Sequence, residues 1–404
     1  MIGFRYNYDF TMSDKGGNMD NFRFHAYTNM LFGKDQIKNL PQLVSTYGKN
    51  VLLVYGGGSI KKIGIYDKVM ELLKDCNVVE LSGVEPNPRI TTVERGVALC
   101  KEHNIDVILA VGGGSTIDCS KVIAAGYYYD GPTWDIVLDS SKIDKVLPII
   151  TILTLAATGS EMNKNAVISN METNEKLGTS SMDMIPMASI LDPTYLYSLP
   201  AIQTAAGTAD IMSHVFENYF KADTTAFIQD RFAEGILKAC IKYCKIALEK
   251  PDDYEARANL MWASSMALNG LVGAGKAGAW TCHPIEHELS AYYDITHGVG
   301  LAIVTPRWMR YILSENTVDK FVEYGVHVWG LDASKDKYTL ANEAIDKTEE
   351  FFKDCKIPMT LTELGIDASN FEIMAEKAVR FGGLKDAYVP LTKDDVVQIL
   401  NMCL

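Results

Sequence analysis

The sequence predicts an α/β amino-terminal domain with a parallel sheet, followed by an all-α carboxy-terminal domain. In the first half, short β-branched runs alternate with helical stretches, and two of these runs end in the same tetrapeptide, Gly-Gly-Gly-Ser. Beyond Leu199-Pro200 the chain becomes rich in Ala, Met, Glu and Lys at helical spacing. Apolar strands separated by helices are typical of a parallel sheet covered on both faces, whereas long stretches of strong helix formers favour a helical domain. A chain of 404 residues also exceeds one simple core, so two domains are expected.

The predicted strands of the first half are uninterrupted apolar runs, at residues 51–55, 77–81, 106–111 and 147–153. The predicted helices between them cover residues 66–75, 91–103 and 116–125. The longest apolar stretch, residues 146–157, contains Pro148, Thr151 and Thr154. It is too short to span a bilayer and is interpreted as a buried strand.

The second half is predicted to be nearly all helix, because few strand-like runs remain in it. The predicted helices are residues 203–220, 225–248, 254–269, 283–291, 298–314, 317–328, 338–355, 369–380 and 394–402. A glycine-rich connector, residues 270–279, interrupts them. The change of character near residue 199 sets the predicted boundary between residues 19–198 and residues 199–404.

The composition excludes some classes of partner. A hydrophobic content of 48% and a charged content of 22% are those of an ordinary globular protein, and the net charge of −13 argues against nucleic acid or an anionic membrane. Backbone N–H groups can still hold the phosphates of a cofactor locally. No secretory signal is visible at the start, and the eight scattered cysteines favour free thiols in a reducing cytoplasm over half of a metal site at Cys240 and Cys244.

A metal site is predicted from the spacing of acids and histidines. Asp210 and His214 lie four residues apart in a predicted helix, so their side chains share one face. His283 and His287 repeat this offset, and His297 follows ten residues later. One carboxylate with imidazoles suits Zn²⁺ or Fe²⁺ better than Ca²⁺ or Mg²⁺. Either pair alone is more often an ordinary polar pair, and the spacing does not decide which of the five residues is not a ligand.

The glycine turn at residues 112–115 follows a predicted strand and precedes a predicted helix. This layout presents backbone N–H groups and a helix N-terminus to a phosphate. It is not the Gly-x-Gly-x-x-Gly fingerprint, since Ile117 occupies the third glycine position. Asp118 either is an acid favoured by the helix dipole or orients the loop. A plain tight turn is the alternative reading of this motif.

The turn at residues 56–59 bears on cofactor choice. Enzymes specific for NAD place an acid just past an early strand, where it binds the ribose 2′-hydroxyl and repels a 2′-phosphate. Here the sequence Gly56-Gly57-Gly58-Ser59 is followed by Ile60, Lys61 and Lys62, without an acid. The two lysines can equally be solvated residues at a helix start. The missing acid favours NADP(H), with NAD(H) as the alternative cofactor.

These motifs resemble the iron-containing (group III) alcohol dehydrogenase family, in its butanol dehydrogenase branch. The resemblance runs from Met19 to the C-terminus and leaves residues 1–18 as an N-terminal extension. The matching segments are Phe32-Gly33-Lys34, Gly112-Gly113-Gly114-Ser115-x-x-Asp118, Thr154-Leu155-Ala156-Ala157-Thr158-Gly159-Ser160-Glu161, Gly207-x-x-Asp210-x-x-x-His214, His283-Pro284-x-Glu286-His287-x-Leu289-Ser290 and Asp294-x-x-His297-Gly298.

The resemblance implies roles for single residues. Metal ligands are implied at Asp210, His214, His283 and His297, and His287 is implied to be a histidine beside the substrate that does not bind the metal. Cofactor contacts are implied at Gly57, Gly58, Ser59, Gly112, Gly113, Ser115, Asp118, Thr154, Leu155, Thr158 and Lys176. The family fold is a dinucleotide-binding α/β domain and a helical domain with the active site between them. The metal is expected to be Fe²⁺, with Zn²⁺ as the alternative, and a homodimer is expected.

The expected reaction is hydride transfer between NADP(H) and a short-chain alcohol or aldehyde such as butanol or butanal. The metal is expected to polarise the carbonyl, and His287 to relay the proton. One rival is a metal- and NAD-dependent lyase similar to dehydroquinate synthase, but the apolar neighbours of the predicted ligands do not suit its highly anionic substrate. The other rival is a non-catalytic nucleotide-binding sensor, whose structural metal site would be richer in Cys.

Overall fold

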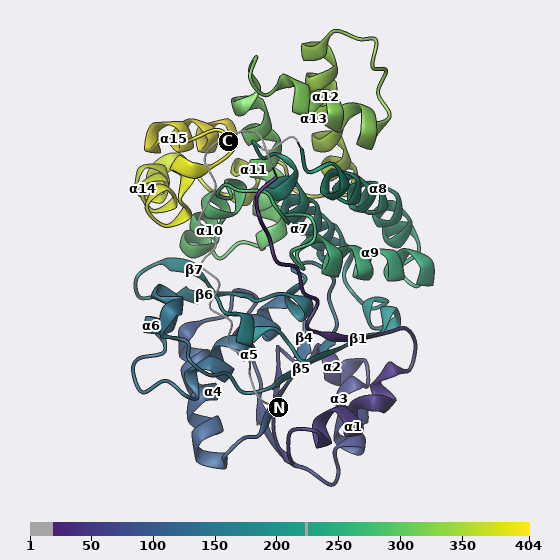
Figure 1. The fold of residues 1–404 in the computed structure, drawn as a ribbon, viewed down its shortest axis with the longest axis vertical. Coiled ribbons are helices and arrows are strands. Elements are labelled where there is room, and N and C mark those ends of the chain that lie inside the picture. Colours follow the sequence, from purple (N-terminus) through teal and green to yellow (C-terminus); the bar gives the residue numbers. More distant parts are fainter. Residues whose placement is uncertain (1–18, 223–224) are drawn as a thin grey trace.

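The structure is a computed structural model of the chain, and it describes residues 19–222 and 225–404. The predicted N-terminal extension, residues 1–18, lies outside the described residues. Figure 1 shows a sheet-containing half at the bottom and a helical half at the top. This arrangement confirms the predicted fold class.

The sheet of the first half has six parallel strands in the order β1-β8-β5-β4-β2-β3. The strands are β1 (Asn29–Phe32), β2 (Asn50–Tyr55), β3 (Asn77–Leu81), β4 (Val107–Gly112), β5 (Ile149–Leu153) and β8 (Ala188–Leu191). All residues of β4 and β5 are buried, as expected for central strands with a helix layer on each face. The four predicted strands are therefore present, each within about two residues of its predicted bounds.

Helices cover both faces of this sheet. The side chains of α4 (Ile90–His103) and α5 (Gly114–Gly126) pack with Leu52, Val54 and Ile108 on one face. On the other face, α1 (Leu40–Ser45) and α3 (Ile65–Leu72) pack with Val51, Leu53 and Leu109. Figure 1 shows the two layers on opposite sides of the strands. The short helices α2 (Ser59–Lys62) and α6 (Trp134–Leu138) complete this half.

Four strands were not predicted. β1 and β8 pair with each other and extend the sheet beyond β5. β6 (Asn165–Asn170) and β7 (Glu175–Ser180) form a separate antiparallel hairpin. β1 and β8 have only four residues each, and the six-residue strands β6 and β7 contain several polar residues. None of the four therefore has the apolar run by which the other strands were recognised.

The second half is helical, as predicted. Its helices are α7 (Ala201–Tyr219), α8 (Phe227–Glu249), α9 (Tyr254–Ala267), α10 (Cys282–Tyr293), α11 (His297–Ile312), α12 (Val318–Trp329), α13 (Lys337–Asp354), α14 (Phe371–Gly382) and α15 (Lys393–Met402). In the described part of the chain, short 3-10 helices lie at Gln36–Asn39, Ser140–Lys142, Ser160–Met162, Met182–Met184, Pro193–Leu196, Thr362–Leu364, Ala368–Asn370 and Leu384–Asp386. One large apolar core unites these helices, with Phe216, Phe220, Trp308 and Phe321 among its bulky members. Within the described residues, no helix is long and apolar enough to cross a membrane.

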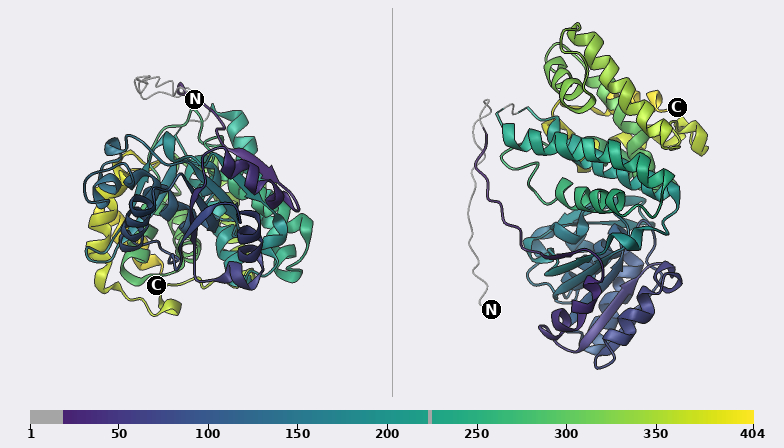
Figure 2. Two further views of the ribbon diagram at one scale, coloured as in Figure 1. Left: turned by 90° about the horizontal axis from the view of Figure 1, so that it is seen from below. Right: turned by 90° about the vertical axis from the view of Figure 1, so that its right-hand side faces the viewer.

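The two halves meet where the strands end. The loops that follow β2, β4 and β5 all lie at the edge of the sheet that faces the helical half, because parallel strands share one carboxyl end. In Figure 2 the helices of the second half stand directly above this edge. Here α10 contacts β7, and α9 contacts the 3-10 helices Ser160–Met162 and Pro193–Leu196, which follow β5 and β8. The candidate site lies in this junction.

Candidate active site

Three helices of the second half supply the predicted metal ligands. Asp210 and His214 lie one turn apart in α7, so the helical periodicity places both on the face toward the sheet half. His283 is in the first turn of α10, and His297 is the first residue of α11. Asp294, with a left-handed backbone at φ 50°, ends α10 and turns the chain toward α11. The turn lets the first residue of α11 come back to the start of α10.

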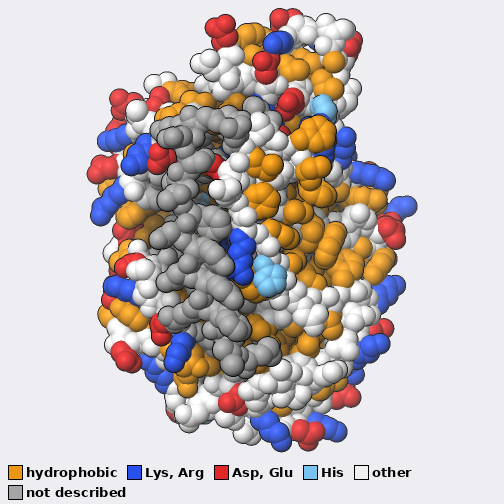
Figure 3. All heavy atoms as spheres, viewed as in Figure 1, with side chains coloured by type: hydrophobic (Ala, Val, Ile, Leu, Met, Phe, Trp, Pro, Cys, Tyr) orange, Lys and Arg blue, Asp and Glu red, His pale blue; other side chains and the backbone are white. Residues whose placement is uncertain are grey.

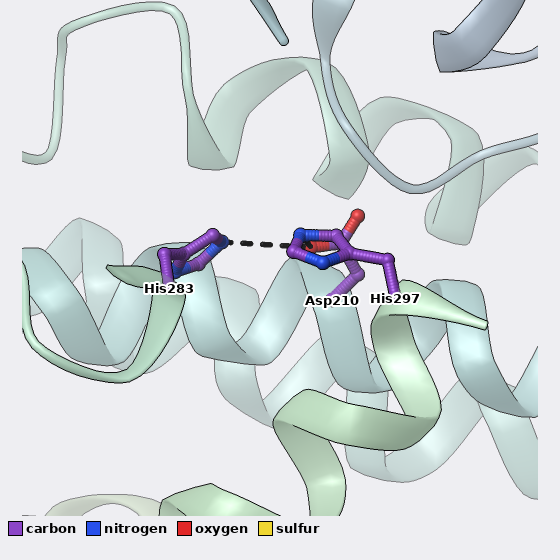
Figure 4. Close-up of side chains that lie close together, drawn as sticks. All are labelled: Asp210, His283 and His297. Carbon is purple, nitrogen blue, oxygen red and sulfur yellow. Dashed lines mark ion pairs between the residues drawn. The ribbon is translucent and has the colours of Figure 1, made fainter. Parts of the chain in front are cut away.

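The Asp210 carboxylate lies close to all three imidazoles, and the ligand atoms of Asp210, His283 and His297 all lie within 4.8 Å of one another. Asp210 Oδ1 lies 3.5 Å from His214 Nε2, and it lies 3.7 Å from both His283 Nε2 and His297 Nε2. Figure 4 shows Asp210, His283 and His297 facing one another from their three helices. Ligand atoms around a tetrahedral ion with bonds of about 2.0–2.2 Å are themselves roughly 3.3–3.6 Å apart. The separations here therefore suit atoms that share one cation.

Unpartnered buried atoms support the same interpretation. Asp210 Oδ1 and His283 Nε2 are buried and have no hydrogen-bond partner among the described residues. A buried polar atom without a partner is costly, and a bound cation would satisfy both. The donor set of one carboxylate and three imidazoles suits Fe²⁺ or Zn²⁺. The residues present thus fit the predicted metal.

The ionisation of these groups is strongly coupled. Burial by itself would raise the pKa of Asp210, but the neighbouring imidazoles hold it below its usual range. Burial lowers the pKa of His214 to about 4, despite the attraction of Asp210. At His283 the carboxylates of Asp210 and Glu217 outweigh burial and raise the pKa to about 9. Asp210 is therefore an ionised acceptor, as a metal ligand must be.

Two carboxylates that the sequence analysis did not single out contact the ligand imidazoles. Glu217 Oε1 lies 3.1 Å from His283 Nδ1, and Glu286 Oε2 accepts a hydrogen bond from His297 Nδ1. Each glutamate lies three residues after a predicted ligand, Glu217 after His214 and Glu286 after His283. This three-residue offset in a helix is the sequence signal that could have identified them. Each glutamate nevertheless contacts a histidine of the next helix: Glu217 of α7 contacts His283 of α10, and Glu286 of α10 contacts His297 of α11.

A second group of nearby ligand atoms consists of Glu286, His287 and His297. Its carboxylate is already engaged, because Glu286 accepts hydrogen bonds from Ser290 and lies 3.5 Å from Lys176 Nζ. Asp210, by contrast, has a free buried oxygen. The Asp210 group is therefore the better metal site.

His287 lies beside the ligands and lines the same cleft. Its ring centroid is 5.6 Å from that of His297 and 6.3 Å from that of His283. Burial, with a smaller contribution from the Lys176 ammonium, lowers the pKa of His287 well below its ordinary value. The imidazole is thus neutral near neutral pH and can accept a proton.

The glycine turn after β4 faces the ligands across the cleft. α5 begins at Gly114, so the N-terminus of a long helix opens at this point. The turn is packed too tightly for side chains: a Cβ on Gly112 would lie 2.4 Å from Thr116 Oγ1, and one on Gly114 would lie 2.3 Å from Thr158 Oγ1. Asp118 accepts hydrogen bonds from Ser160 Oγ at 2.5 Å and from the Val167 backbone N–H at 2.9 Å. Asp118 thus connects α5 to the segment that follows β5 and to β6.

One cleft of about 1120 Å³ joins the turn to the metal site. The predicted cofactor residues that line it are Gly57, Ser59, Gly112, Gly113, Ser115, Asp118, Thr154, Leu155, Thr158 and Lys176. Gly58 does not line the cleft; it begins α2 with a left-handed backbone at φ 99°. Lys176 Nζ lies 3.4 Å from His297 Nδ1, so its ammonium sits at the metal end of the cleft.

The cleft wall beside the metal site is largely apolar, with Leu199, Leu268, Trp280 and Ile295 among its members. The Trp280 ring centroid lies 4.7 Å from that of His283. Among the described residues that line the cleft, Lys176 is the one Lys or Arg. A small neutral substrate suits this end better than a highly anionic one.

Known proteins are similar to this chain over most of its length. Residues 28–193 match the iron-containing alcohol dehydrogenase family, and residues 204–404 match the C-terminal domain of the Fe-containing alcohol dehydrogenase family. The chain is 60% identical to the NADH-dependent butanol dehydrogenase A of Clostridium acetobutylicum over 95% of its length and 99% of that protein. It is 39% identical to the NADPH-dependent aldehyde reductase YqhD of Escherichia coli over 90% of its length and 94% of that protein. The crystal structure of an NADH-dependent butanol dehydrogenase A from Thermotoga maritima superposes with a TM-score of 0.91 at 39% identity, covering 96% of this chain and 100% of that one.

Proposed function

The chain belongs to the iron-containing alcohol dehydrogenase family and is an NAD(P)-dependent alcohol dehydrogenase, and from this premise we propose that it interconverts butanal and butanol or similar short primary substrates. The observation that carries the proposal is the cleft itself. It joins the carboxylate and imidazoles of Asp210, His214, His283 and His297 to the glycine turn at the N-terminus of α5. Proximity of a hydride donor and a polarised carbonyl is what the reaction requires.

The four predicted ligands would hold Fe²⁺, with Zn²⁺ as the alternative ion. A cation bound there supplies Lewis acidity, which polarises an aldehyde carbonyl and lowers the pKa of a bound alcohol. Asp210 contributes the single carboxylate of the set, so one negative charge is placed against a divalent ion. The remaining positive charge favours an oxygen of the substrate.

The cofactor would lie along the glycine turn. Backbone N–H groups of Gly112 and Gly113 and the α5 N-terminus would receive the pyrophosphate, with Ser115 beside it. Thr154, Leu155 and Thr158 follow β5 and lead toward the metal, where they would border the nicotinamide end. Gly57 and Ser59 would contact the adenosine ribose. Lys176, at the metal end, would reach the ribose next to the nicotinamide.

We propose that NADP(H) is the preferred cofactor and NAD(H) the second one. Gly56, Gly57 and Ser59 line the cleft at the end of β2 and offer no carboxylate. Glu80 of β3 accepts hydrogen bonds from the hydroxyls of Tyr55 at 2.6 Å and Tyr66 at 2.7 Å. Residues 56–59 themselves therefore place no carboxylate against a 2′-phosphate. Glu85, which follows β3, is an acid that lines the same cleft. The name of the Clostridium acetobutylicum relative favours NADH and that of the Escherichia coli relative favours NADPH.

His287 is the proposed proton carrier. It lies next to His283 and His297 without sharing the Asp210 group, and it lines the cleft where a substrate oxygen would sit. In alcohol oxidation its neutral imidazole would accept the hydroxyl proton, and in aldehyde reduction the imidazolium would return it.

We also propose a homodimer in the cytoplasm. β1 is an edge strand of the described sheet, and an unpaired edge can pair with another chain. Phe227, Ile228 and Phe232 of α8 and Trp262 of α9 are exposed hydrophobic residues, and Figure 3 shows hydrophobic side chains gathered on this side of the molecule. All eight cysteines are free, which suits a reducing compartment.

Purified protein loaded with Fe²⁺ or Zn²⁺ tests the proposal. Oxidation of NADPH and of NADH is followed with butanal and with longer aldehydes, and kcat/KM is compared for the two cofactors. We expect metal-dependent butanal reduction with a higher kcat/KM for NADPH. A higher value for NADH would overturn the cofactor proposal alone, and no turnover of any short aldehyde or alcohol with either cofactor would overturn the reaction.

A further inference from the structure

Both carboxylate oxygens of Glu217 accept hydrogen bonds from the start of α10, where His283 lies. It is buried in α7 and lies on the same face as Asp210 and His214. Glu217 Oε2 accepts from the Thr281 backbone N–H at 2.7 Å, and Oε1 accepts from the His283 backbone N–H at 2.9 Å. The same Oε1 is 3.1 Å from His283 Nδ1. One carboxylate thus holds both the start of α10 and the imidazole that it presents.

Glu286 has the same relation to His297. It is fully buried in α10, and its two oxygens have different partners. Ser290 Oγ donates to Oε1, while Oε2 receives His297 Nδ1 and lies 3.5 Å from Lys176 Nζ. The imidazole of His297 is thereby held at the ring nitrogen that faces away from Asp210.

His214 differs from the other two imidazoles. Its Nδ1 is buried and has no hydrogen-bond partner among the described residues. Its ring instead stacks on that of His283, with centroids 4.7 Å apart. Carboxylate support is thus confined to the two histidines outside α7.

We infer that Glu217 and Glu286 are positioning residues that fix the tautomers of His283 and His297 for a dication, an inference that rests on the proposed function. With Nδ1–H donating to a carboxylate, the lone pair of each imidazole is on Nε2, the atom that faces Asp210. The carboxylate also raises the basicity of the ligand imidazole.

The net charge of the buried side chains around Asp210 favours a divalent cation. Asp210, Glu217 and Glu286 are buried acids, and Lys176 is a buried base in contact with Glu286. With neutral imidazoles these groups carry a net charge of about −2, and buried charge without compensation is costly. A divalent cation bound by these imidazoles and Asp210 would neutralise that charge.

The test is metal affinity, measured without turnover. Metal-free wild-type protein and the variants Glu217→Gln, Glu217→Ala, Glu286→Gln and Glu286→Ala are titrated with Co²⁺ and with Zn²⁺, and the visible spectrum of each Co²⁺ form is recorded. We expect affinity to fall about 10-fold in the Gln variants and about 100-fold in the Ala variants, with altered Co²⁺ spectra. NADPH binding to the metal-free Glu217 variants should stay unchanged, because Glu217 contacts the start of α10 and the His283 imidazole. The Glu286 variants are judged by metal affinity and the Co²⁺ spectrum, because Glu286 also contacts Lys176, a proposed cofactor residue.

Glu288→Gln is the matched control, since Glu288 is also a buried acid of α10 but makes no contact with a ligand imidazole. Its metal affinity should equal that of the wild type. Gln preserves side-chain volume, so the Gln variants decide the outcome where an Ala variant does not fold. Affinities of both Gln variants within twofold of the wild type would overturn the inference. A wild type that binds neither ion would overturn the proposed function instead.

Discussion

Gly207 of α7 lies directly against the carbonyl oxygen of Ala156. A Cβ at residue 207 would be 2.5 Å from that oxygen, well inside van der Waals contact. Ala156 belongs to the loop after β5, and Asp210 is one turn further along α7. The absence of a side chain at this position therefore sets how closely the predicted metal ligands approach the predicted cofactor loop.

We expect Gly207→Ala to separate the two halves at this contact. The substitution should lower the free energy of unfolding by about 1–3 kcal/mol, because neither backbone can yield easily. It should also raise the KM for the cofactor. Urea titration and initial-rate kinetics measure both. Gly235→Ala is the control: a Cβ there meets nothing within 4 Å in the exposed face of α8, so stability should rise by about 0.5–1 kcal/mol. Equal effects of the two substitutions would contradict the argument.

Gly114→Ala should weaken cofactor binding. Its Cβ would lie 2.3 Å from Thr158 Oγ1, which accepts a hydrogen bond from the Ser160 backbone N–H. Moving Thr158 would disturb the surface proposed to hold the pyrophosphate. We expect the dissociation constant for NADPH to rise about 10-fold, equivalent to about 1.4 kcal/mol, with metal content unchanged. NADPH titration and metal analysis of the same preparation check this, and unaltered NADPH affinity would count against the assignment of the loop.

Much of the fold could be predicted from local patterns. The helices α7 to α15 show the spacing of their apolar faces in the sequence, and β2, β4 and β5 are uninterrupted apolar runs. β8 could not be recognised, because Ala188–Leu191 is four residues long and contains Ser189. Its place in the sheet depends on pairing with β5 and β1, which is a tertiary property.

The candidate site was predictable only in part for the same reason. Helical spacing joins Asp210 to His214, but it does not place His297 beside them, since that contact depends on how α11 packs on α7. The resemblance to a family supplied the full ligand set before the structure brought it together. Glu217 and Glu286 looked like ordinary helical acids in the sequence, and their partners lie on neighbouring helices.

His287→Ala should remove the proposed proton carrier. Because burial lowers the pKa of His287 well below its ordinary value, the neutral form prevails at neutral pH. Alcohol oxidation by the wild type should therefore slow only at a pH well below that ordinary value. We expect kcat to fall about 100-fold in the variant and this acid limb to vanish, with metal content retained. Rate profiles over pH for both proteins decide the matter. An unchanged profile would remove His287 from the mechanism.

Glu288 should make the stability of the protein depend on pH. Its side chain is buried in α10, and Oε2 has no hydrogen-bond partner among the described residues. Burial raises its pKa to about 8, and the ammonium of Lys377 offsets only part of this. Lys377 Nζ is itself held by the carbonyl oxygens of Thr173 and Asn174, each at 2.9 Å.

The sign of the effect follows from proton uptake. Between the ordinary pKa of 4.5 and the raised value of about 8, the folded protein keeps a proton on Glu288 that the unfolded chain has lost. The contribution of Glu288 to the free energy of unfolding is therefore fully present below the ordinary pKa of 4.5, and it is lost as the pH rises through the raised pKa of about 8. Glu288→Gln stays neutral throughout, so its stability relative to the wild type should increase between pH 5.5 and pH 8 by on the order of 2 kcal/mol. Urea titrations of both proteins at the two pH values, at equal metal content, measure this difference, and the same difference at both pH values would show that Glu288 ionises normally in the folded protein.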